Sequence, residues 1–340
     1  MAGIATMITA DRLQQYLRAF RDKRILVVGD MMLDRFLTGN VSRISPEAPV
    51  PVVEITREVA YPGGAANVAR NLVPFAGKAA AAGLVGKGLR GEELIALMRE
   101  TGIDTTGILR GDDHETIVKT RIAARGQQIV RLDRERRAPL TPARTKEALE
   151  FLGEWIPGYD AIIIEDYAKG FITQDLADGV CRMAAECGAL VAIDPNPGNP
   201  LHWHGATAIK PNLKEAMQDA AMPPIPGWRE GDHPGDWLTE LGKRLLAKWD
   251  TQMVLVTLGE HGMALFERGA DAAFHIPTRA KEVFDVSGAG DTAIALFTLA
   301  LSAGAHPHEA AEISNHASGI VVAKSGTATL TPEELVEAVR

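Results

Sequence analysis

Four short, continuous apolar segments constrain the fold of this 340-residue chain more than any other feature of its sequence. They span residues 24–30, 161–166, 189–194 and 253–257. Segments of this kind, rich in valine, isoleucine and leucine, are typical of parallel strands that are buried on both faces of a sheet. The hydrophobic content of 46% is sufficient for a large core around such a sheet.

Segments with helical periodicity alternate with these strands. They cover residues 10–20, 65–75, 92–101, 142–155, 174–187 and 236–249, and Thr9 can cap the first of them. The alternation predicts an α/β fold with a doubly wound, mostly parallel sheet flanked by helices. Ligands of such sheets bind beyond the carboxyl ends of the strands. Because three of the four apolar segments end in aspartate, we expect acidic side chains to cluster there.

Two segments, residues 37–58 and 116–133, break this alternation. The first is rich in proline, which suits edge strands, and the second alternates between polar and apolar residues. We interpret both as extended or hairpin pieces outside the main sheet that form a small β lid on a single domain spanning residues 1–340. A polar stretch rich in glycine and proline at residues 227–235 is expected to be a surface loop.

Basic side chains gather in this lid, namely Arg43, Lys119, Arg121, Arg125 and Arg131. On a strand, Lys119 and Arg121 would share one face. One interpretation is that these cations are simply solvated at the surface. The other is that they bind a phosphate group of the substrate, which arginine can hold with two parallel hydrogen bonds.

Charge and composition argue against several classes of protein. The net charge of −8 does not suit a protein that binds nucleic acid through bulk basicity. No apolar run reaches the roughly 18 residues that span a membrane, and the first ten residues lack the pattern of a secretion signal. The two cysteines match no zinc motif and suit a reducing compartment. We therefore expect a cytoplasmic protein that binds neither nucleic acid nor membrane.

The most informative motif for function is Asp-Val-Ser-Gly-Ala-Gly-Asp-Thr at residues 285–292, where an apolar helix begins. Each glycine in a helix costs up to about 1 kcal/mol relative to alanine, so these glycines indicate that a ligand approaches the backbone closely. The N–H groups of Gly288, Ala289 and Gly290, with the positive end of the helix dipole, would bind phosphate. Asp291 beside such an anion hole suits a base that takes a proton from an attacking hydroxyl. The alternative is that Asp291 only interacts favourably with the dipole.

A second glycine-rich helix start lies at residues 63–71. Gly64 would let a ligand lie against the backbone, and Asn67 can both donate and accept hydrogen bonds with hydroxyl groups. A tight turn before a packed helix is the alternative. Asp34, which follows the first strand, can bind two sugar hydroxyls, and an exposed loop acid is the alternative there.

Two further motifs leave structural and functional interpretations open. Asn212 can cap a helix with Glu215 in the capping-box position, or the oxygens of both can help to hold Mg²⁺, often through water, near nucleotide phosphates. Residues 86–91 match the dinucleotide pattern G-x-G-x-x-G. No acid follows at the end of a clear second strand, however, so a nicotinamide dehydrogenase is only a rival interpretation. No Walker phosphate-binding motif is present in the sequence.

Several of these motifs resemble those of a known family. Residues 63–69 and 285–291 are similar to the two signatures of the ribokinase (phosphofructokinase-B) family of sugar kinases. Residues 33–35, 42–53, 166–170 and 319–322 also resemble the branch of that family that phosphorylates heptose 7-phosphate for the lipopolysaccharide core. The resemblance implies a ribokinase-like fold and ATP-dependent phosphorylation of the C1 hydroxyl of D-glycero-D-manno-heptose 7-phosphate, with the β anomer favoured. The alternative is a kinase of the same fold that acts on another sugar or sugar phosphate.

The resemblance also implies roles for individual residues. Asp291 corresponds to the base, and the anion hole corresponds to Gly288, Ala289 and Gly290. Sugar contacts correspond to Asp34, Gly64 and Asn67, to which we add the lid cations Arg43, Lys119 and Arg121 as candidates for the sugar's phosphate. The ATP site corresponds to Asn212, Glu215, Thr257, Gly259, Gly262 and Asn315, with Glu215 near Mg²⁺, directly or through water. Since lids of this family commonly pair across a dimer, we expect a homodimer.

Overall fold

The computed structural model describes residues 8–223, 235–280, 282–324 and 326–340. Within them, the main sheet has nine strands: β1 (Arg24–Gly29), β4 (Lys78–Gly86), β5 (Asp104–Gly111), β8 (Ala161–Glu165), β9 (Leu190–Asp194), β10 (Ala208–Ile209), β11 (Met253–Thr257), β12 (Met263–Glu267) and β13 (Phe274–Ile276). Their order in space is β13-β12-β11-β10-β9-β8-β1-β4-β5. The strands from β11 to β5 pair in parallel, and β12 and β13 add an antiparallel edge. The expected mostly parallel sheet is confirmed.

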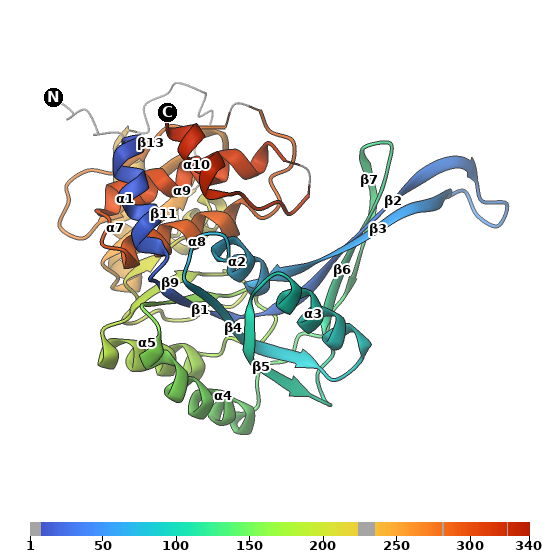
Figure 1. Ribbon diagram of the computed structural model, residues 1–340, viewed down its shortest axis with the longest axis horizontal. Helices are drawn as coiled ribbons and strands as arrows, with labels where there is room; N and C mark the ends of the chain where they lie inside the picture. The colour runs from blue at the N-terminus through green and yellow to red at the C-terminus, as the bar shows by residue number, and fades with distance from the viewer. Residues whose placement is uncertain (1–7, 224–234, 281, 325) are drawn as a thin grey trace.

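Helices cover both faces of this sheet (Figure 1). One face is covered by α1 (Ala10–Phe20), α2 (Ala65–Leu72), α3 (Leu89–Glu100), α8 (Ala289–Ser302), α9 (Pro307–Val322) and α10 (Pro332–Val339). The other is covered by α4 (Pro142–Trp155), α5 (Gln174–Cys187), α6 (Leu213–Asp219) and α7 (Gly235–Trp249). Alternate residues of β1 enter the two cores, Ile25 on the first side and Leu26 on the second. The continuous apolar segments therefore arise because both faces of each strand are buried.

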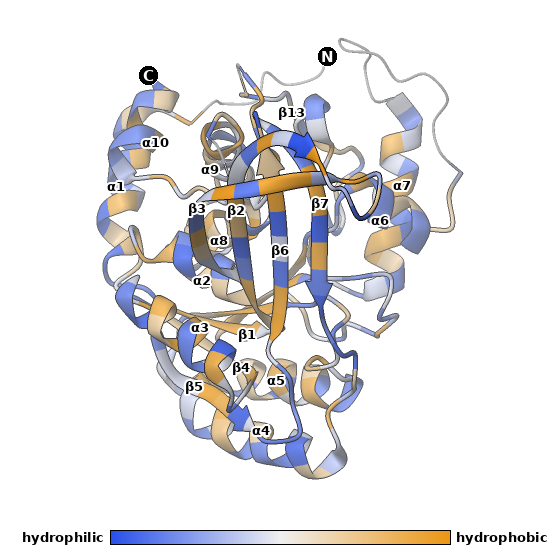
Figure 2. Ribbon diagram, turned by 90° about the vertical axis from the view of Figure 1, so that its right-hand side faces the viewer, coloured by the Kyte–Doolittle hydropathy of each residue, from blue (hydrophilic) through white to orange (hydrophobic). Residues whose placement is uncertain are grey.

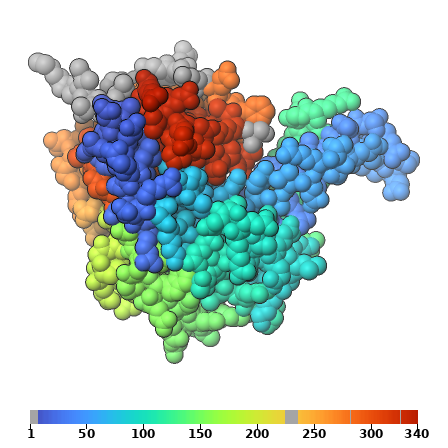
Figure 3. Space-filling model, viewed as in Figure 1, coloured from blue at the N-terminus to red at the C-terminus, as the bar shows by residue number. Residues whose placement is uncertain are grey.

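A second sheet of four strands forms the lid: β2 (Met31–Ile44), β3 (Pro51–Gly64), β6 (Ile117–Ala124) and β7 (Gln127–Arg134). Their order is β3-β2-β6-β7, with β2 and β6 parallel and the two outer pairs antiparallel. Figure 2 shows these strands side by side, and in Figures 1 and 3 the β2–β3 hairpin projects from the body of the molecule as an arm. The proline-rich segment lies on or beside the edge strand β3, as its composition predicts.

The lid begins earlier and ends later than the sequence indicates. Strand β2 starts at Met31, directly after the main sheet, and β3 continues to Gly64. Asp34 and Gly64 are therefore residues of the lid strands, and the interpretation of Asp34 as an exposed loop acid is wrong because the residue is only 5% exposed. The expected loop at residues 227–235 lies outside the described residues except for Gly235, where α7 begins.

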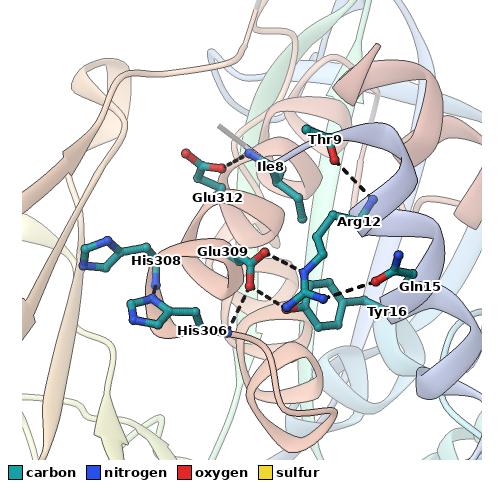
Figure 4. Close-up of polar contacts among 9 residues, drawn as sticks. All are labelled: Ile8, Thr9, Arg12, Gln15, Tyr16, His306, His308, Glu309 and Glu312. Carbon is teal, nitrogen blue, oxygen red and sulfur yellow. Dashed lines mark hydrogen bonds and ion pairs between the residues drawn. The ribbon is translucent and has the colours of Figure 1, made fainter. Parts of the chain in front are cut away.

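Helix α1 is fastened to α9 by a small group of polar side chains (Figure 4). Thr9 caps α1, as predicted, by accepting a hydrogen bond from the Arg12 N–H at 3.3 Å. Glu309, in the first turn of α9, accepts hydrogen bonds from Arg12 Nε at 2.9 Å and from the Tyr16 hydroxyl. Glu312 of α9 accepts a hydrogen bond from the Ile8 N–H. Residues 8–20 are thus an integral part of one helical layer.

Among the described residues, none of the helices has the length and apolar character that crossing a membrane requires.

Candidate active site

The candidate site lies at the carboxyl ends of β1, β8 and β9, at the point where the order of strands in the sheet reverses. Strands β4 and β5 extend the sheet on one side of β1, and β8 to β11 extend it on the other. Such a switch point leaves a crevice in which ligands of this fold type bind. A cavity of about 730 Å³ opens here, and its lining includes the acids Glu165, Asp166 and Asp194. The expected cluster of strand-end acids is confirmed.

The start of α8 forms one wall of this cavity, which Ala289 and Gly290 line. Gly288 precedes the helix with a φ of 83°, a left-handed conformation that favours glycine. A Cβ atom at Gly288 would lie 3.0 Å from the side-chain nitrogen of Asn67, so any larger residue would be crowded. Within the described part of the chain, the N–H groups of Gly288, Gly290 and Asp291 have no acceptor, whereas the Ala289 N–H, which was expected in the anion hole, donates to the Val286 carbonyl at 3.3 Å. The helix start is therefore open to an anion.

Asp291 is buried at this helix start, with 8% of its surface exposed. Its two oxygens accept hydrogen bonds from different elements: Oδ2 from Asn67 Nδ2 at 2.6 Å and Oδ1 from the Tyr167 hydroxyl at 2.9 Å. Burial raises the pKa of Asp291, while the hydrogen bonds from Asn67 and Tyr167 oppose that rise. A carboxylate held in this way, with a pKa closer to neutrality than usual, is suited to accept a proton.

The two glycine-rich helix starts, which the sequence presents as separate motifs, form one site. Helices α2 and α8 pack together, and the Thr292 hydroxyl of α8 donates a hydrogen bond to Asn71 Oδ1 of α2 at 2.8 Å. This packing places Asn67 against Asp291 although the two residues are 224 positions apart in the chain. Gly64, with a φ of 60°, precedes α2 and leads the chain from the lid into the helix.

A buried ion pair, which the sequence analysis did not predict, lies beside the anion hole. Lys210 Nζ is 2.7 Å from Asp194 Oδ2, and the lysine is 4% exposed. The ammonium group would lie 3.5 Å from a Cβ atom at Gly290 and therefore faces the helix start. Burial alone would lower the pKa of Lys210, but attraction to Asp194 and Glu165 outweighs it and raises the pKa, so the side chain stays charged.

Glu165 completes this group of charges on the floor of the cavity. It pairs in register with Asp194 on the neighbouring strand, and its Oε2 atom is buried without a hydrogen-bond partner. Burial, together with the negative charges of Asp194 and Asp291, raises the pKa of Glu165 well above its usual range. The only sequence signal for these residues is their position at or just beyond the end of a strand.

Asn212 and Glu215 occupy the structural one of the two roles that the sequence left open. Asn212 Oδ1 accepts a hydrogen bond from the Glu215 N–H at 3.0 Å, and Glu215 Oε2 accepts one from the Asn212 N–H at 2.8 Å. This capping box at the start of α6 confirms the structural interpretation. Both residues also line the cavity, so the functional interpretation stays a prediction with suitable geometry.

The remaining residues expected around the nucleotide lie on the same cavity, which is lined by Thr257, Gly259, Gly262 and Asn315. Asn315 is held in place because its side-chain nitrogen donates to the Pro277 carbonyl at 2.7 Å. Exposed apolar side chains from the segment before α8, Val283 and Val286, line the cavity as well. This end of the cavity can therefore cover a flat, apolar surface of a ligand.

Two cations of lid strand β6, Lys119 and Arg121, contact residues of the candidate site. Arg121 pairs with Asp34 at 2.7 Å, so its charge is already balanced. Lys119 has no carboxylate partner among the described residues, and its Nζ lies 5.6 Å from the centre of the Tyr167 ring. Burial and the nearby Lys169 lower the pKa of Lys119. Arg43 lies apart from this group, near the outer end of β2.

The donor atoms are compatible with Mg²⁺ bound jointly with a nucleotide. No group of three or more histidine, cysteine, aspartate or glutamate side chains in the described chain could hold a metal by itself. Magnesium, however, is usually bound by one or two carboxylates together with substrate phosphates and water. Asp194 and Glu215 line the same cavity and can supply such carboxylates.

Comparison with known proteins places this site in context. Residues 22–334 match the model of a family described as pfkB family carbohydrate kinase. The chain is 40% identical over 316 residues to the bifunctional protein HldE of Desulfatibacillum aliphaticivorans, and 42% identical over 316 residues to that of Geobacter metallireducens. Each of these alignments covers 93% of this chain and 63% of the relative, so the chain spans less than two thirds of the length of these curated relatives.

Solved structures share the fold. Phosphofructokinase-2 from Escherichia coli, solved in complex with potassium, superposes with a TM-score of 0.72 at 20% identity, covering 93% of this chain and 98% of the other. Ribokinase from Arabidopsis thaliana, solved with ribose and ATP, superposes with a TM-score of 0.69 at 16% identity, covering 94% of this chain and 99% of the other. The expected ribokinase-like fold is therefore confirmed.

Proposed function

The chain belongs to the pfkB family of carbohydrate kinases, and from that premise we propose that it transfers the γ-phosphoryl group of ATP to the C1 hydroxyl of D-glycero-D-manno-heptose 7-phosphate. The product is the 1,7-bisphosphate, with the β anomer favoured, and it supplies heptose for the lipopolysaccharide core. The resemblance of residues 33–35, 42–53 and 166–170 to heptose 7-phosphate kinases supports this substrate. Membership of the family argues against the rival dehydrogenase.

One observation carries the proposal: the carboxylate of Asp291 lies in the first turn of α8, whose start lines the cavity, and it accepts hydrogen bonds from Asn67 and from Tyr167, which lines the cavity as well. In the proposed step, the C1 oxygen forms a bond to the γ-phosphorus, the bond from that phosphorus to the β–γ bridging oxygen breaks, and ADP leaves. The hydroxyl proton passes to Asp291. The N–H groups at the start of α8 and the Lys210 ammonium stabilise the negative charge on the transferring group.

The cavity suits ATP as the donor. Its volume of about 730 Å³ lies within the range of small-molecule sites, and it combines an apolar end with a charged end. The neighbouring fold of Arabidopsis ribokinase, solved with ATP, supports this choice. In the proposed complex, Thr257, Gly259, Gly262 and Asn315 surround the nucleoside, and Lys210 and the start of α8 lie at its phosphates. When bound, Mg²⁺ would neutralise phosphate charge, and Glu215 and Asp194 would hold it directly or through water.

The lid suits a phosphorylated sugar. In the proposed complex, Asp34 and Asn67 orient the sugar hydroxyls against the backbone at Gly64. Lys119 is the first candidate for the 7-phosphate because its charge has no carboxylate partner among the described residues, whereas Arg121 is paired with Asp34. Arg43 is too far along β2 to reach the same phosphate in one chain, since nine residues of strand span about 30 Å.

We also propose that residues 1–340 form one kinase domain, that this domain works in the cytoplasm, and that it pairs through its lid. Apolar side chains of the lid are exposed, among them Ile44, Ile55 and Leu132. Such side chains on a projecting edge indicate an interaction surface. A second copy of this chain is the partner we propose.

A panel of sugars tests the substrate. The wild-type chain would be supplied with ATP and Mg²⁺ and with heptose 7-phosphate, unphosphorylated heptose, fructose 1-phosphate or ribose, and ADP release would be measured by a coupled assay. We expect the highest kcat/KM with heptose 7-phosphate, and ³¹P NMR of the product should show a new anomeric phosphate. A higher kcat/KM with another sugar of the panel would replace the substrate but keep the kinase, whereas no ADP release with any of them would contradict the proposal.

A further inference from the structure

We propose that Tyr167 is the positioning residue of the catalytic base, fixing the Asp291 carboxylate and connecting it to the lid. The inference rests on the proposed function in one respect, namely that Asp291 is the base. Tyr167 lines the cavity, and its hydroxyl is the only group of the 165–170 segment that forms a hydrogen bond with Asp291 among the described residues. Nothing in the spacing of the sequence motifs predicts this contact.

The loop that carries Tyr167 is rigid because a buried carboxylate organises it. Asp30, at the end of β1, is 3% exposed and accepts hydrogen bonds from the N–H groups of Tyr167, Lys169 and Phe171, each at 3.0 Å. Within this loop, Ala168 has a φ of 55° and Gly170 a φ of 112°. The left-handed conformation costs conformational energy at Ala168, and the three hydrogen bonds to Asp30 compensate for it. The Tyr167 hydroxyl is therefore presented from a fixed frame.

Tyr167 and Asn67 together fix the plane of the Asp291 carboxylate. Each donates to a different oxygen, at 2.9 Å and 2.6 Å, and the two donors come from separate elements. Loss of either donor would free rotation about the bond between Cβ and Cγ. Because reacting groups must be held within a fraction of an ångström, such freedom lowers the rate even when the base is present.

The direction of the hydrogen bond is defined. Burial and the neighbouring Asp291 charge raise the pKa of Tyr167 well above its usual range, so the phenol stays protonated and donates throughout the working pH range. A donor to the carboxylate stabilises the charged form of Asp291 and lowers its pKa. Tyr167 thus has an effect on Asp291 that can be measured without any substrate.

The ring of Tyr167 also contacts the lid. Lys119, on β6, lies over it with Nζ 5.6 Å from the ring centre, within the range of a cation–π interaction. Lys119 shares its face of β6 with Arg121, which pairs with Asp34 on β2. One side chain therefore contacts the lid through its ring and the base through its hydroxyl, so the position of the lid and the alignment of the base are coupled.

The test compares Tyr167→Phe with a matched control, Tyr159→Phe. Tyr159 is a buried tyrosine that stacks on Trp155, on the face of the sheet opposite α8. The pKa of Asp291 would be measured by NMR on the intact chain labelled with ¹³C at aspartate side chains, with Asp291→Asn identifying the resonance. We expect Tyr167→Phe to raise the pKa by about one unit, the effect of losing a hydrogen bond to a charged group, and Tyr159→Phe to leave it unchanged.

A second perturbation has the opposite sign and keeps the phenol hydroxyl at residue 167. Fluorotyrosine in place of tyrosine makes the phenol a stronger donor, so the pKa of Asp291 should fall. An Asp291 resonance that titrates at the same pH in wild type, Tyr167→Phe and fluorotyrosine protein overturns the inference. These readouts require no sugar, so they remain interpretable if heptose 7-phosphate is not the substrate.

Activity supplies the test of lid coupling. With the best sugar of the panel, we expect Tyr167→Phe to lower kcat about tenfold with little change in the KM for ATP, and to move the acidic limb of the kcat profile to higher pH. In a double-mutant cycle, Lys119→Met and Tyr167→Phe should be non-additive. Additive effects on kcat would overturn the link to the lid, and an unmoved acidic limb would overturn the positioning role.

Discussion

At the scale of single residues, a few hydrogen-bond donors and one ammonium group offset the free-energy cost of burying the carboxylates of the site. Asp291 has two hydrogen-bond donors and Asp194 has one ammonium, and both are acids that burial alone would neutralise. Glu165 has no hydrogen-bond partner at Oε2, and burial together with Asp194 and Asp291 raises its pKa well above the usual range of a carboxyl, although the Lys210 charge opposes this rise. The charges available for chemistry are therefore those that a specific neighbour stabilises.

Removal of the base is the first prediction at this scale. Asp291→Asn keeps the size of the side chain but cannot accept the proton, so turnover should fall by about two to four orders of magnitude. The melting temperature and ATP binding should stay near wild type. Asp250→Asn, at an exposed acid, is the control and should keep full turnover. ADP release close to the wild-type rate would remove Asp291 from the mechanism.

The buried pair gives a second prediction. Lys210→Met leaves Asp194 buried without its counter-charge, and breaking such a pair costs about 3–5 kcal/mol. The free energy of unfolding, measured by urea denaturation, should fall accordingly. The double variant Lys210→Met with Asp194→Asn should recover much of that loss but none of the turnover.

The control for this prediction is the exposed pair of Lys146 and Glu150 on α4. Lys146→Met should change the free energy of unfolding by no more than about 0.5 kcal/mol. If Lys210→Met were as mild as Lys146→Met, the pair beside the helix start would not be buried in the way described.

At the scale of elements, the start of α6 allows the role of Glu215 as a helix cap to be tested separately from its proposed role at Mg²⁺. Glu215→Gln retains an acceptor for the Asn212 N–H, because glutamine serves equally in a capping box, so the melting temperature should hardly change. Loss of the carboxylate charge should raise the Mg²⁺ concentration for half-maximal rate by about 10- to 100-fold. Glu334→Gln is the matched control, since it occupies the same capping position in α10. Equal Mg²⁺ dependence in both variants would restrict Glu215 to the helix cap.

The attachment of α1 to α9 predicts a pH dependence of stability. Burial would raise the pKa of Glu309, but the hydrogen bonds from Arg12 and Tyr16 outweigh it and lower the pKa below the usual 4.5. A depressed carboxyl pKa stabilises the fold above about pH 4.5, and this contribution is lost as the pH falls through the lower, folded-state value. Glu309→Gln should therefore melt earlier than wild type at pH 7.

The difference in melting temperature between wild type and Glu309→Gln should shrink as the pH falls below 4.5. Thermal unfolding at pH 7 and at pH 3.5 measures it. Glu240→Gln, in an exposed pair on α7, should show a small and nearly constant difference. A difference between Glu309→Gln and wild type that does not change with pH would show that Glu309 is not the group that titrates.

At the scale of the whole molecule, the sequence predicts the layers better than the site. The strands of the main sheet are predictable because burial on both faces leaves a continuous apolar run, as in β8 and β11. The start of β2 is not, because Met31 follows Asp30 directly and periodicity does not show that the chain has passed into another sheet. Tyr167 is missed for a related reason: its partner Asp291 is 124 residues away and only the packed fold brings them together.

Residues whose role follows from the local backbone conformation are easier to predict from the sequence than residues whose role depends on a distant partner. Gly288 and Gly290 conflict with helix propensity, so a local rule is broken in the sequence itself, and the structure shows the open helix start that explains the conflict. Lys210 breaks no local rule, because a lysine before a proline is unremarkable until Asp194 is found beside it. A site residue that conflicts with the local secondary-structure propensity can be recognised in a sequence. A site residue that depends on a charge pair with a distant part of the chain cannot.

The projecting lid gives the prediction that belongs to the molecule as a whole. Ile44 is 61% and Ile55 46% exposed on the β2–β3 hairpin, and pairing of two lids would cover them. Light scattering after size exclusion should give twice the mass of one chain for the wild type, and one chain for the variant with Ile44→Asp and Ile55→Asp. Leu89→Asp, at an 89% exposed position at the start of α3, is the control and should stay dimeric.

Since the lid also carries Lys119 over Tyr167, the monomeric variant should keep its melting temperature but lose kcat/KM for the sugar. A wild type that remains a single chain at tens of micromolar would instead assign the exposed lid residues to another partner or to none.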